Sequence, residues 1–489
     1  MSKKQSHPLI FGTIILTATG FLSRIIGFFY RIYLSRLFGE EGMGIYQLLT
    51  PVLSLSFSLT AAGYQTAISK LVAEQAAREK RPSFRPLAVG LSISLPLSLL
   101  CNLAVYRFAD VIAVSLLQEA RTADMLRILS FSIPFGAVHA CANGYFYGIK
   151  KAGIPSASQL LEQLTRVGCV YIISARSLSL GRTPSVDLAV LGLTVGEFFS
   201  MVISMGAAWQ CYAKDHRAKR IPLVQSADSY GNSSGIVHGR SSNAVYGRSS
   251  GAVCSRFSGI LHGRSSGVLY SKLLAMALPL TANRIVLNLL QSVESVSIPA
   301  RLRLHGYDNV TALSVYGVLT GMAMPFIFFP NALTSSVAIL LLPMISESFA
   351  LGDMNTVKRT AVRTVKYCGL MGFGCMCVFV LFGRWAGENL FHSPLAGYFI
   401  TTLGFICPFL YLDTTLSSIL QGLGLAGHIF VLNVICLLIR LGFVFLAVPK
   451  FGISGYLWGL LVSQLTLGML YLVCLYRFLK KNEKRDVTA

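Results

Sequence analysis

The chain has 489 residues, of which 54% are hydrophobic and 13% are charged, and its formal net charge is +22. The charged share is about half of the share found in soluble domains. Because no soluble core could cover this much apolar surface, the composition predicts an all-α polytopic membrane protein and excludes a soluble globular one. The positive charges collect in alternate loops between apolar segments, which is typical of membrane topology and argues against a nucleic-acid partner.

Twelve apolar segments are predicted to be transmembrane helices. The first segment is too long for the core of a signal peptide, and Arg24 interrupts it, so we expect an uncleaved first span. In chain order the predicted spans are 9–33, 44–67, 86–107, 124–147, 155–176, 187–212, 271–299, 310–345, 362–383, 395–423, 428–447 and 453–477.

The distribution of Lys and Arg predicts the orientation in the membrane. With the N-terminus inside, the inner segments hold 27 of these residues and the outer loops hold 9. Since cytoplasmic loops carry the excess of positive charge, we expect both termini in the cytoplasm.

An internal repeat divides the predicted helices into two sets, because residues 131–210 recur at 405–477. The matched positions include Pro134-Phe135 with Pro408-Phe409, Arg166 with Arg440, Glu197 with Gln464, and Arg24 with Arg284. Two sets of six spans on one plan, each with charged residues in corresponding helices, are typical of a transporter. We therefore predict two parallel six-helix lobes around a central cavity.

These patterns give four predicted regions. The N-lobe is 1–212, the linker is 213–270, the C-lobe is 271–478, and a basic cytoplasmic tail follows at 479–489. The linker contains a tandem repeat of eight residues, such as GRSSGAVC at 247–254, in which Gly and Ser dominate. This composition predicts a flexible cytoplasmic segment, either an expanded repeat without a role or a surface for anionic headgroups.

Arginines inside predicted spans are the main candidates for a binding site. An ionised group at the centre of a bilayer costs on the order of 3 kcal/mol, so it is expected to face the interior of the bundle or an aqueous cavity. Arg24 and Arg31 are seven residues apart and share one face of their helix. The alternative for Arg31 is a side chain that extends to the outer interface. The predicted substrate-binding residues are Arg24, Arg31, Arg284 and Arg440.

Acids also lie inside spans, at Glu162, Glu197, Glu294 and Asp413. Glu162 precedes Arg166 by four residues, which is the favourable order for an ion pair along one helix. Arg440 has no such partner, because Cys436 occupies the matching position. Glu162, Arg166 and Glu197 are therefore predicted to act either in ion coupling or in structural support.

The sequence contains no catalytic constellation. It has no glycine loop for nucleotide phosphates, and its eight histidines are dispersed. The eleven cysteines show neither zinc-ligand spacing nor a disulfide framework. We therefore predict no enzymatic activity, no metal site and no cofactor.

Three stretches carry a resemblance to a known group of transporters. They are FLSRIIGFFYR at 21–31, GMGIYQ at 42–47 and ALPLTANR at 277–284. The first resembles the opening helix of the multidrug/oligosaccharidyl-lipid/polysaccharide exporter superfamily. Together they resemble the stage V sporulation protein B group of oligosaccharide flippases within it, and the chain is also similar to MurJ-type lipid II flippases.

The resemblance implies two six-helix lobes that move lipid-linked sugars by alternating access, with arginines of the first helix, here Arg24 and Arg31, lining the cavity. The first hypothesis is a flippase of the bacterial inner membrane for an undecaprenyl-pyrophosphate saccharide or a peptidoglycan precursor of the spore cortex. Its expected partners are this lipid-linked substrate, membrane lipids and cell-wall synthesis enzymes. The alternatives are a cation-coupled multidrug exporter and a non-transporting scaffold for envelope assembly.

Overall fold

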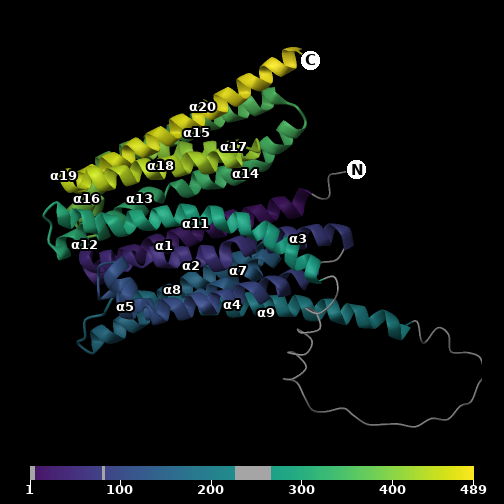
Figure 1. Ribbon diagram of the computed structural model, residues 1–489, viewed down its shortest axis with the longest axis horizontal. Helices are drawn as coiled ribbons and strands as arrows, with labels where there is room; N and C mark the ends of the chain where they lie inside the picture. The colour runs from purple at the N-terminus through teal and green to yellow at the C-terminus, as the bar shows by residue number, and fades with distance from the viewer. Residues whose placement is uncertain (1–5, 80–82, 226–265, 489) are drawn as a thin grey trace, which may run out of the picture.

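The computed structural model describes residues 6–79, 83–225 and 266–488, and within these ranges it is helical with no strand. The long helices run roughly parallel to the long axis of the molecule (Figure 1). We call the end that holds the start of α1, the end of α9, the start of α11 and the end of α20 the terminal end (Figure 1). The opposite end, with α5, α12, α16 and α19, is the distal end.

The N-lobe contains the helices up to α9. Its elements are α1 (Ser6–Leu48), α2 (Thr50–Phe57), the π-helical turn η1 (Ser58–Ala62), α3 (Gly63–Glu79), α4 (Arg85–Arg107), α5 (Ala109–Val111), the π-helical turn η2 (Ile112–Leu116), α6 (Thr122–Ser130), α7 (Ser132–Gly148), α8 (Gly153–Ser179) and α9 (Asp187–Gln225).

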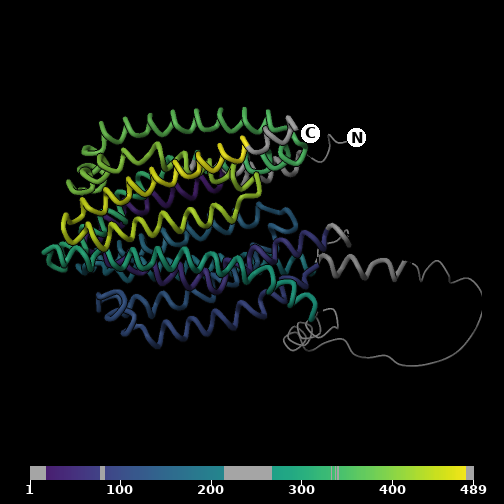
Figure 2. Tube along the Cα trace, turned by 45° about the horizontal axis from the view of Figure 1, so that its top comes forward, coloured from purple at the N-terminus to yellow at the C-terminus, as the bar shows by residue number. Residues whose placement is uncertain are grey.

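The C-lobe repeats this arrangement. Its elements are α11 (Ser266–Leu304), α12 (Asn309–Gly317), the π-helical turn η3 (Val318–Ala323), α13 (Met324–Phe328), α14 (Asn331–Ala350), α15 (Met354–Leu390), α16 (Pro394–Gly404), α17 (Cys407–Gly422), α18 (Ala426–Leu446), α19 (Val448–Phe451) and α20 (Ile453–Thr488). The two lobes lie side by side, with α1 and α11 between them (Figures 1 and 2).

Every predicted span is mostly helical, but four of them contain a break, at Leu49, at Phe131, at Phe329 and Pro330, and at Phe405 and Ile406. The chain leaves helical geometry at Gly39 (φ 69°, ψ −170°), so α1 contains the first predicted span and the start of the second. In the described residues, nine helices are long and apolar enough to cross a membrane, or ten if the bent pair α16 and α17 counts as one span. The stretch Ala18–Ala76 counts once among the nine although it covers two predicted spans, and α8, with Glu162 and Arg166 in its middle, is not among them.

The helices that flank the predicted linker are longer than expected. Helix α9 continues to Gln225 and α11 begins at Ser266, so both enter the segment assigned to the linker. Helix α20 runs to Thr488 through the predicted tail. Residues 226–265, which include most of the eight-residue repeats, lie outside the described residues.

The lobes approach each other most closely where small residues permit it. A Cβ atom on Gly44 would lie 2.1 Å from the carbonyl oxygen of Leu313, and one on Gly317 would lie 2.3 Å from that of Glu40. A Cβ atom on Gly63 would lie 1.9 Å from Oγ1 of Thr281. Glycine is needed at these positions because any side chain would push the helices of the two lobes apart.

The core crosses the boundary between the lobes. Leu269, Leu273 and Ala277, in the first half of α11, are buried in one cluster with residues of α3, α4 and α7. The hydroxyl groups of Tyr270 and Ser92 lie 2.7 Å apart and join α11 to α4. The first half of α11 therefore belongs to the C-lobe in sequence but packs against the N-lobe.

Candidate functional site: charged residues inside the bundle

In the C-lobe, Arg440 is held by an acid on another helix. Its Nη2 atom donates to Oε2 of Glu294 at 2.6 Å, which joins α18 to α11. The hydroxyl of Tyr456 on α20 donates to Oε1 of the same carboxylate at 2.8 Å. Glu294 is buried, so this pair is shielded from solvent and fastens three helices together.

In the N-lobe, Arg166 is held by its own helix. Its Nη2 atom donates to Oε1 of Glu162, one turn earlier on α8, as the sequence spacing predicts. Both side chains are largely buried. The two matched arginines thus each bind a carboxylate, but one contact is local and the other is long-range.

A second group of polar residues surrounds His139 on α7. His139 is not among the site residues predicted from the sequence. Its Nδ1 atom lies 3.3 Å from Oε2 of Glu197, and its Nε2 atom lies 2.8 Å from Nδ2 of Asn143. The hydroxyl groups of Ser200 and Ser158 lie 2.9 and 3.2 Å from Nε2. Because Nδ2 of Asn143 can only donate, Nε2 of His139 accepts and Nδ1 carries the proton that faces Glu197.

His139, Glu162 and Glu197 form one compact cluster, in which one ligand atom from each lies within 4.8 Å of the others. Such an arrangement is able to share a proton or hold a cation. A signal for it exists in the sequence, since His139 and Asn143 are four residues apart on α7 and Ser158 and Glu162 are four apart on α8. Only the packing of α7, α8 and α9 shows that these faces meet.

Arg24 lies on the face of α1 that is turned toward the C-lobe. Phe21 and Phe28, one turn before and after it, contact the ring of Phe329 with centroids 6.3 and 5.1 Å apart. Residues three and four apart share one helix face, so Arg24 is directed between the lobes. The side chain of Arg24 is exposed, and it is not packed into the core of either lobe.

Arg284 occupies the matching place on α11. Thr281, three residues before it, lies against Gly63, and Asn288, four residues after it, donates to the carbonyl oxygen of Ser54 at 3.3 Å and to Oγ of Ser58. Arg284 is also exposed. Both repeat-related arginines are therefore flanked, at the same offsets, by residues that contact the opposite lobe.

Arg31 is half-buried and lies close enough to Arg166 for their charges to interact. Among the described residues no carboxylate forms an ion pair with it. The structure thus places Arg31 near the Glu162–Arg166 pair, whereas Arg24 lies two helical turns nearer the terminal end.

Asp413 on α17 is buried, and neither of its carboxylate oxygens has a hydrogen-bond partner in the described part of the chain. A Cβ atom on Gly468 would lie 3.0 Å from its Oδ1 atom, so α20 passes directly beside it. The sequence marks Asp413 as an acid inside a span, but only the structure shows that it forms no ion pair with any other described residue.

Hydrogen bonds join the two lobes at the distal end. Nε of Arg36 donates to the carbonyl oxygen of Leu390 at 2.9 Å, and the hydroxyl of Ser393 donates to Glu40. Nδ2 of Asn309 donates to Oε2 of Glu119 at 3.1 Å.

Glu119 is a buried member of this distal network. Its Oε1 atom accepts from Nε of Arg121 at 2.6 Å, and Arg121 also binds Glu41 at 2.7 Å. The hydrogen bond from Arg121, followed by that from Asn309, holds the pKa of Glu119 below its usual range. The ionised carboxylate is therefore the form that supports the distal contacts.

The chain is similar to proteins of known family and fold. Residues 9–349 match a family described as polysaccharide biosynthesis protein. Stage V sporulation protein B of Bacillus subtilis (strain 168) is 28% identical over 448 residues, which cover 91% of this chain and 79% of that protein.

Two solved structures share the fold. A multidrug resistance MATE family transporter of the MOP superfamily, in an inward-facing conformation, has a TM-score of 0.68 at 14% identity and covers 96% of this chain and 99% of its own. The lipid II flippase MurJ in an inward closed conformation has a TM-score of 0.66 at 14% identity, covering 95% of this chain and 87% of its own.

These similarities confirm the resemblance to the exporter superfamily and the two-lobed, all-helical fold. They agree with a multi-span membrane protein, as its apolar helices also indicate. Since the family match spans most of the chain, this protein belongs to the polysaccharide biosynthesis protein family.

Proposed function

We propose that this protein is a flippase that moves an undecaprenyl-pyrophosphate-linked saccharide or peptidoglycan precursor across the bacterial inner membrane, for use in spore cortex synthesis. The observation that carries the proposal is the matched placement of Arg24 and Arg284, which both lie exposed between residues that contact the opposite lobe. The similarity to a sporulation protein and to a lipid II flippase supports the substrate class.

The two arginines fit a substrate with a pyrophosphate group. A guanidinium group donates two parallel hydrogen bonds to phosphate oxygens, so one arginine from each lobe can hold one multiply charged ligand. Arg31, which forms no ion pair with a described carboxylate, is in reach to extend this site toward the middle of the bundle. The lipid tail would remain in the bilayer while the lobes move.

The direction of access follows from the two ends of the bundle. The excess of Lys and Arg in alternate loops predicts that the terminal end faces the cytoplasm. The distal network, including Arg36 with Leu390 and Glu119 with Asn309, then joins the lobes on the outer side. We infer that substrate enters from the cytoplasmic side in this state and that these contacts break when the protein opens outward.

The His139–Glu162–Glu197 cluster is the candidate for energy coupling. A histidine beside two carboxylates can gain or lose a proton, or a cation, and change the packing of α7, α8 and α9. Because Glu162 also binds Arg166, a change at this cluster would reach the helix that lies against α1.

A cation-coupled multidrug exporter is the second candidate, favoured by this acidic cluster and by the likeness to a multidrug transporter. Its ligands are cations, which arginines directed between the lobes would repel. The two functions therefore predict opposite effects of removing Arg24 and Arg284.

The test uses cells depleted of their own lipid-linked precursor flippase. Arg24→Ala and Arg284→Ala should each abolish complementation, and Arg→Lys at either position should restore it only in part, because lysine lacks the paired donors. Arg176→Ala, at an exposed position on α8 near the distal end, is the matched control and should remain active. Full activity of both alanine variants at normal protein levels would contradict the proposal and favour a scaffold.

A further inference from the structure

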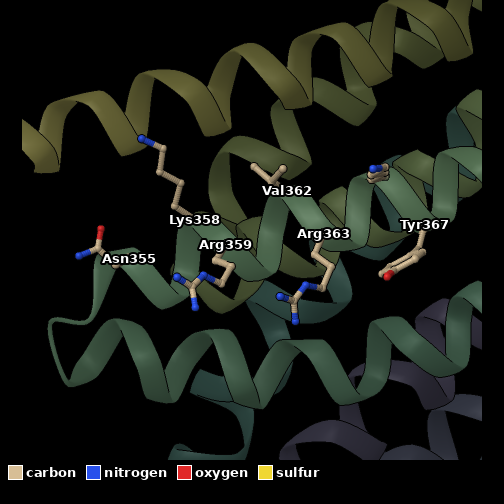
Figure 3. A pocket seen from close by; sticks show the side chains of 7 residues that line it. Asn355, Lys358, Arg359, Val362, Arg363 and Tyr367 are labelled. Atoms are coloured by element: carbon tan, nitrogen blue, oxygen red, sulfur yellow. The ribbon is translucent and has the colours of Figure 1, made fainter.

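A hollow of about 660 Å³ lies at the terminal end of the C-lobe, along the start of α15. It is lined by Asn355, Lys358, Arg359, Val362, Arg363, Lys366 and Tyr367. The side chains of Arg359 and Arg363 extend on the same side of α15, toward the neighbouring helix, and Lys358 extends on the other side (Figure 3). Four positive charges thus lie within about two and a half turns of one helix.

The charges of this hollow have no matching acids in its lining, which contains no Asp or Glu. Arg359, Arg363 and Lys366 form no ion pair with any of the described residues. Asp353, just before α15, accepts from the backbone N–H of Thr356 at 2.9 Å and caps the helix. The charge of Asp353 also interacts with that of Arg359, whereas Arg363 and Lys366 lie further along the helix.

The exposed apolar face of α15 continues directly from these cations. Leu370, Phe373 and Leu381 follow Lys366 along the same face of the helix, at successive intervals of four, three and eight residues. These three side chains are 68%, 55% and 75% exposed. A ligand with an anionic head and hydrocarbon chains would fill both parts of this surface, whereas a soluble anion would contact only the first.

The hollow is separate from the arginines between the lobes. Helix α15 packs against α14, α16, α17 and α20 of its own lobe. Arg24 and Arg284 lie on α1 and α11, at the boundary between the lobes (Figure 1). The ligand of α15 therefore comes from the surrounding bilayer and not from the predicted path of the transported substrate.

We propose that Arg359, Arg363 and Lys366 form a binding site for an anionic phospholipid of the leaflet at the terminal end, with its acyl chains along Leu370 and Phe373. The phosphate accepts hydrogen bonds from the two guanidinium groups, and Lys366 adds a third positive charge beside the head group. This site is independent of the proposed transport function, because neither its residues nor its ligand takes part in it.

Lipid binding to the purified, delipidated full chain tests the proposal, by native mass spectrometry with phosphatidylglycerol and phosphatidylcholine as probes. The wild type should retain phosphatidylglycerol preferentially. The triple variant R359Q/R363Q/K366Q should lose about a hundred-fold in its affinity for phosphatidylglycerol, from three cations near an anionic head group. Phosphatidylcholine binding should not change.

The matched control is R85Q/K150Q/K151Q, which removes three exposed cations from the same end of the N-lobe. It should change phosphatidylglycerol affinity by less than about three-fold. An equal loss in both triple variants would overturn the proposal, because it would show a general attraction of basic loops to anionic lipid.

Two further measurements keep the proposal testable if the triple variant is poorly folded. R359K/R363K preserves the charges and should retain most of the binding, and F373S should weaken phosphatidylglycerol binding but not the weak binding of inorganic phosphate. If phosphate competes fully with phosphatidylglycerol, the site binds a soluble anion. If undecaprenyl pyrophosphate displaces phosphatidylglycerol and binds far more tightly, the site belongs to the substrate. Either result would overturn the assignment to a bilayer phospholipid.

Discussion

The two lobes neutralise equivalent buried arginines in different ways. Arg166 and Arg440 are equivalent in the repeat, and each lies inside a helical lobe where an unpaired charge would be costly. Arg166 takes its carboxylate from Glu162 on the same helix, whereas Arg440 takes it from Glu294 on α11. In the C-lobe the ion pair therefore joins two helices, whereas in the N-lobe it lies within one helix.

In a second pair of equivalent residues it is the N-lobe residue that has partners on other helices. The repeat that places Pro134 on Pro408 also places His139 on Asp413. His139 is surrounded by Glu197, Ser158, Ser200 and Asn143, whereas Asp413 has no hydrogen-bond partner among the described residues.

The reason for this difference lies in the neighbouring positions. Leu432 and Leu467 stand where the N-lobe has Ser158 and Ser200. Apolar residues thus replace hydroxyl groups around Asp413. In the N-lobe, hydrogen bonds therefore connect the polar residues around His139. In the C-lobe, polar residues instead hold α11 against α18 and α20.

The comparison predicts that Glu294→Gln has the largest effect on stability. The substitution leaves Arg440 buried without a negative partner, which costs about 3–5 kcal/mol for a buried pair. Thermal unfolding of the purified protein in detergent should show a large decrease in midpoint.

A rescue experiment shows whether the location of the acid matters. Cys436→Glu places a carboxylate one turn before Arg440, as Glu162 is placed before Arg166. Added to Glu294→Gln, it should recover part of the stability but should not restore the link between α18 and α11. A Glu294→Gln variant as stable as wild type would show that this pair does not hold the lobe together.

Glu162→Gln should have a smaller effect than Glu294→Gln. The charge of Glu197 also interacts with Arg166, so the arginine keeps a compensating negative charge. We expect a loss of about 2 kcal/mol in the same unfolding measurement. Glu162→Gln/Glu197→Gln should lose more than the sum of the single variants, since both acids compensate one arginine.

Contacts between the lobes at the distal end should respond to acid. The pKa of Glu119 is lowered in the folded protein, so its contribution is present above the unfolded pKa and is lost as the pH falls through the lower folded value. Spin labels on the two lobes at the distal end should report a longer distance as the pH falls from about 5 to about 3.

Glu119→Gln is the control for this pH dependence. The variant keeps a side chain of similar size that can still accept from Asn309, but it has no carboxylate to titrate. The change in distance between the lobes should therefore be much smaller. An identical pH response in the variant would assign the effect to other groups.

Asp413→Asn should have the smallest effect. No described cation or donor depends on this carboxylate, so a neutral amide of the same shape should change stability by at most about 1 kcal/mol. His139→Asn, at the equivalent position of the N-lobe, removes a partner of four residues and should be clearly more destabilising. If the two variants lose the same amount of stability, the hydrogen bonds of His139 contribute little to the stability of the N-lobe.

Features that depend on neighbouring residues along the chain could be predicted from the sequence. Apolar segments of sufficient length predicted the helices, and the four-residue spacing predicted the Glu162–Arg166 pair, because both follow from the geometry of a single helix. The predicted span 155–176, which carries Glu162 and Arg166, likewise lies within α8 over Gly153–Ser179.

Which faces of these helices meet could not be predicted from the sequence, because it depends on how the helices pack. The partners Glu294 and Arg440 are separated by 146 residues, and His139 and Glu197 by 58. Their contacts depend on how each helix is rotated about its axis, which is set by the close packing of many side chains and by the small residues that let helices approach. A charged residue inside a span can therefore be found from the sequence, whereas its partner depends on how the helices pack.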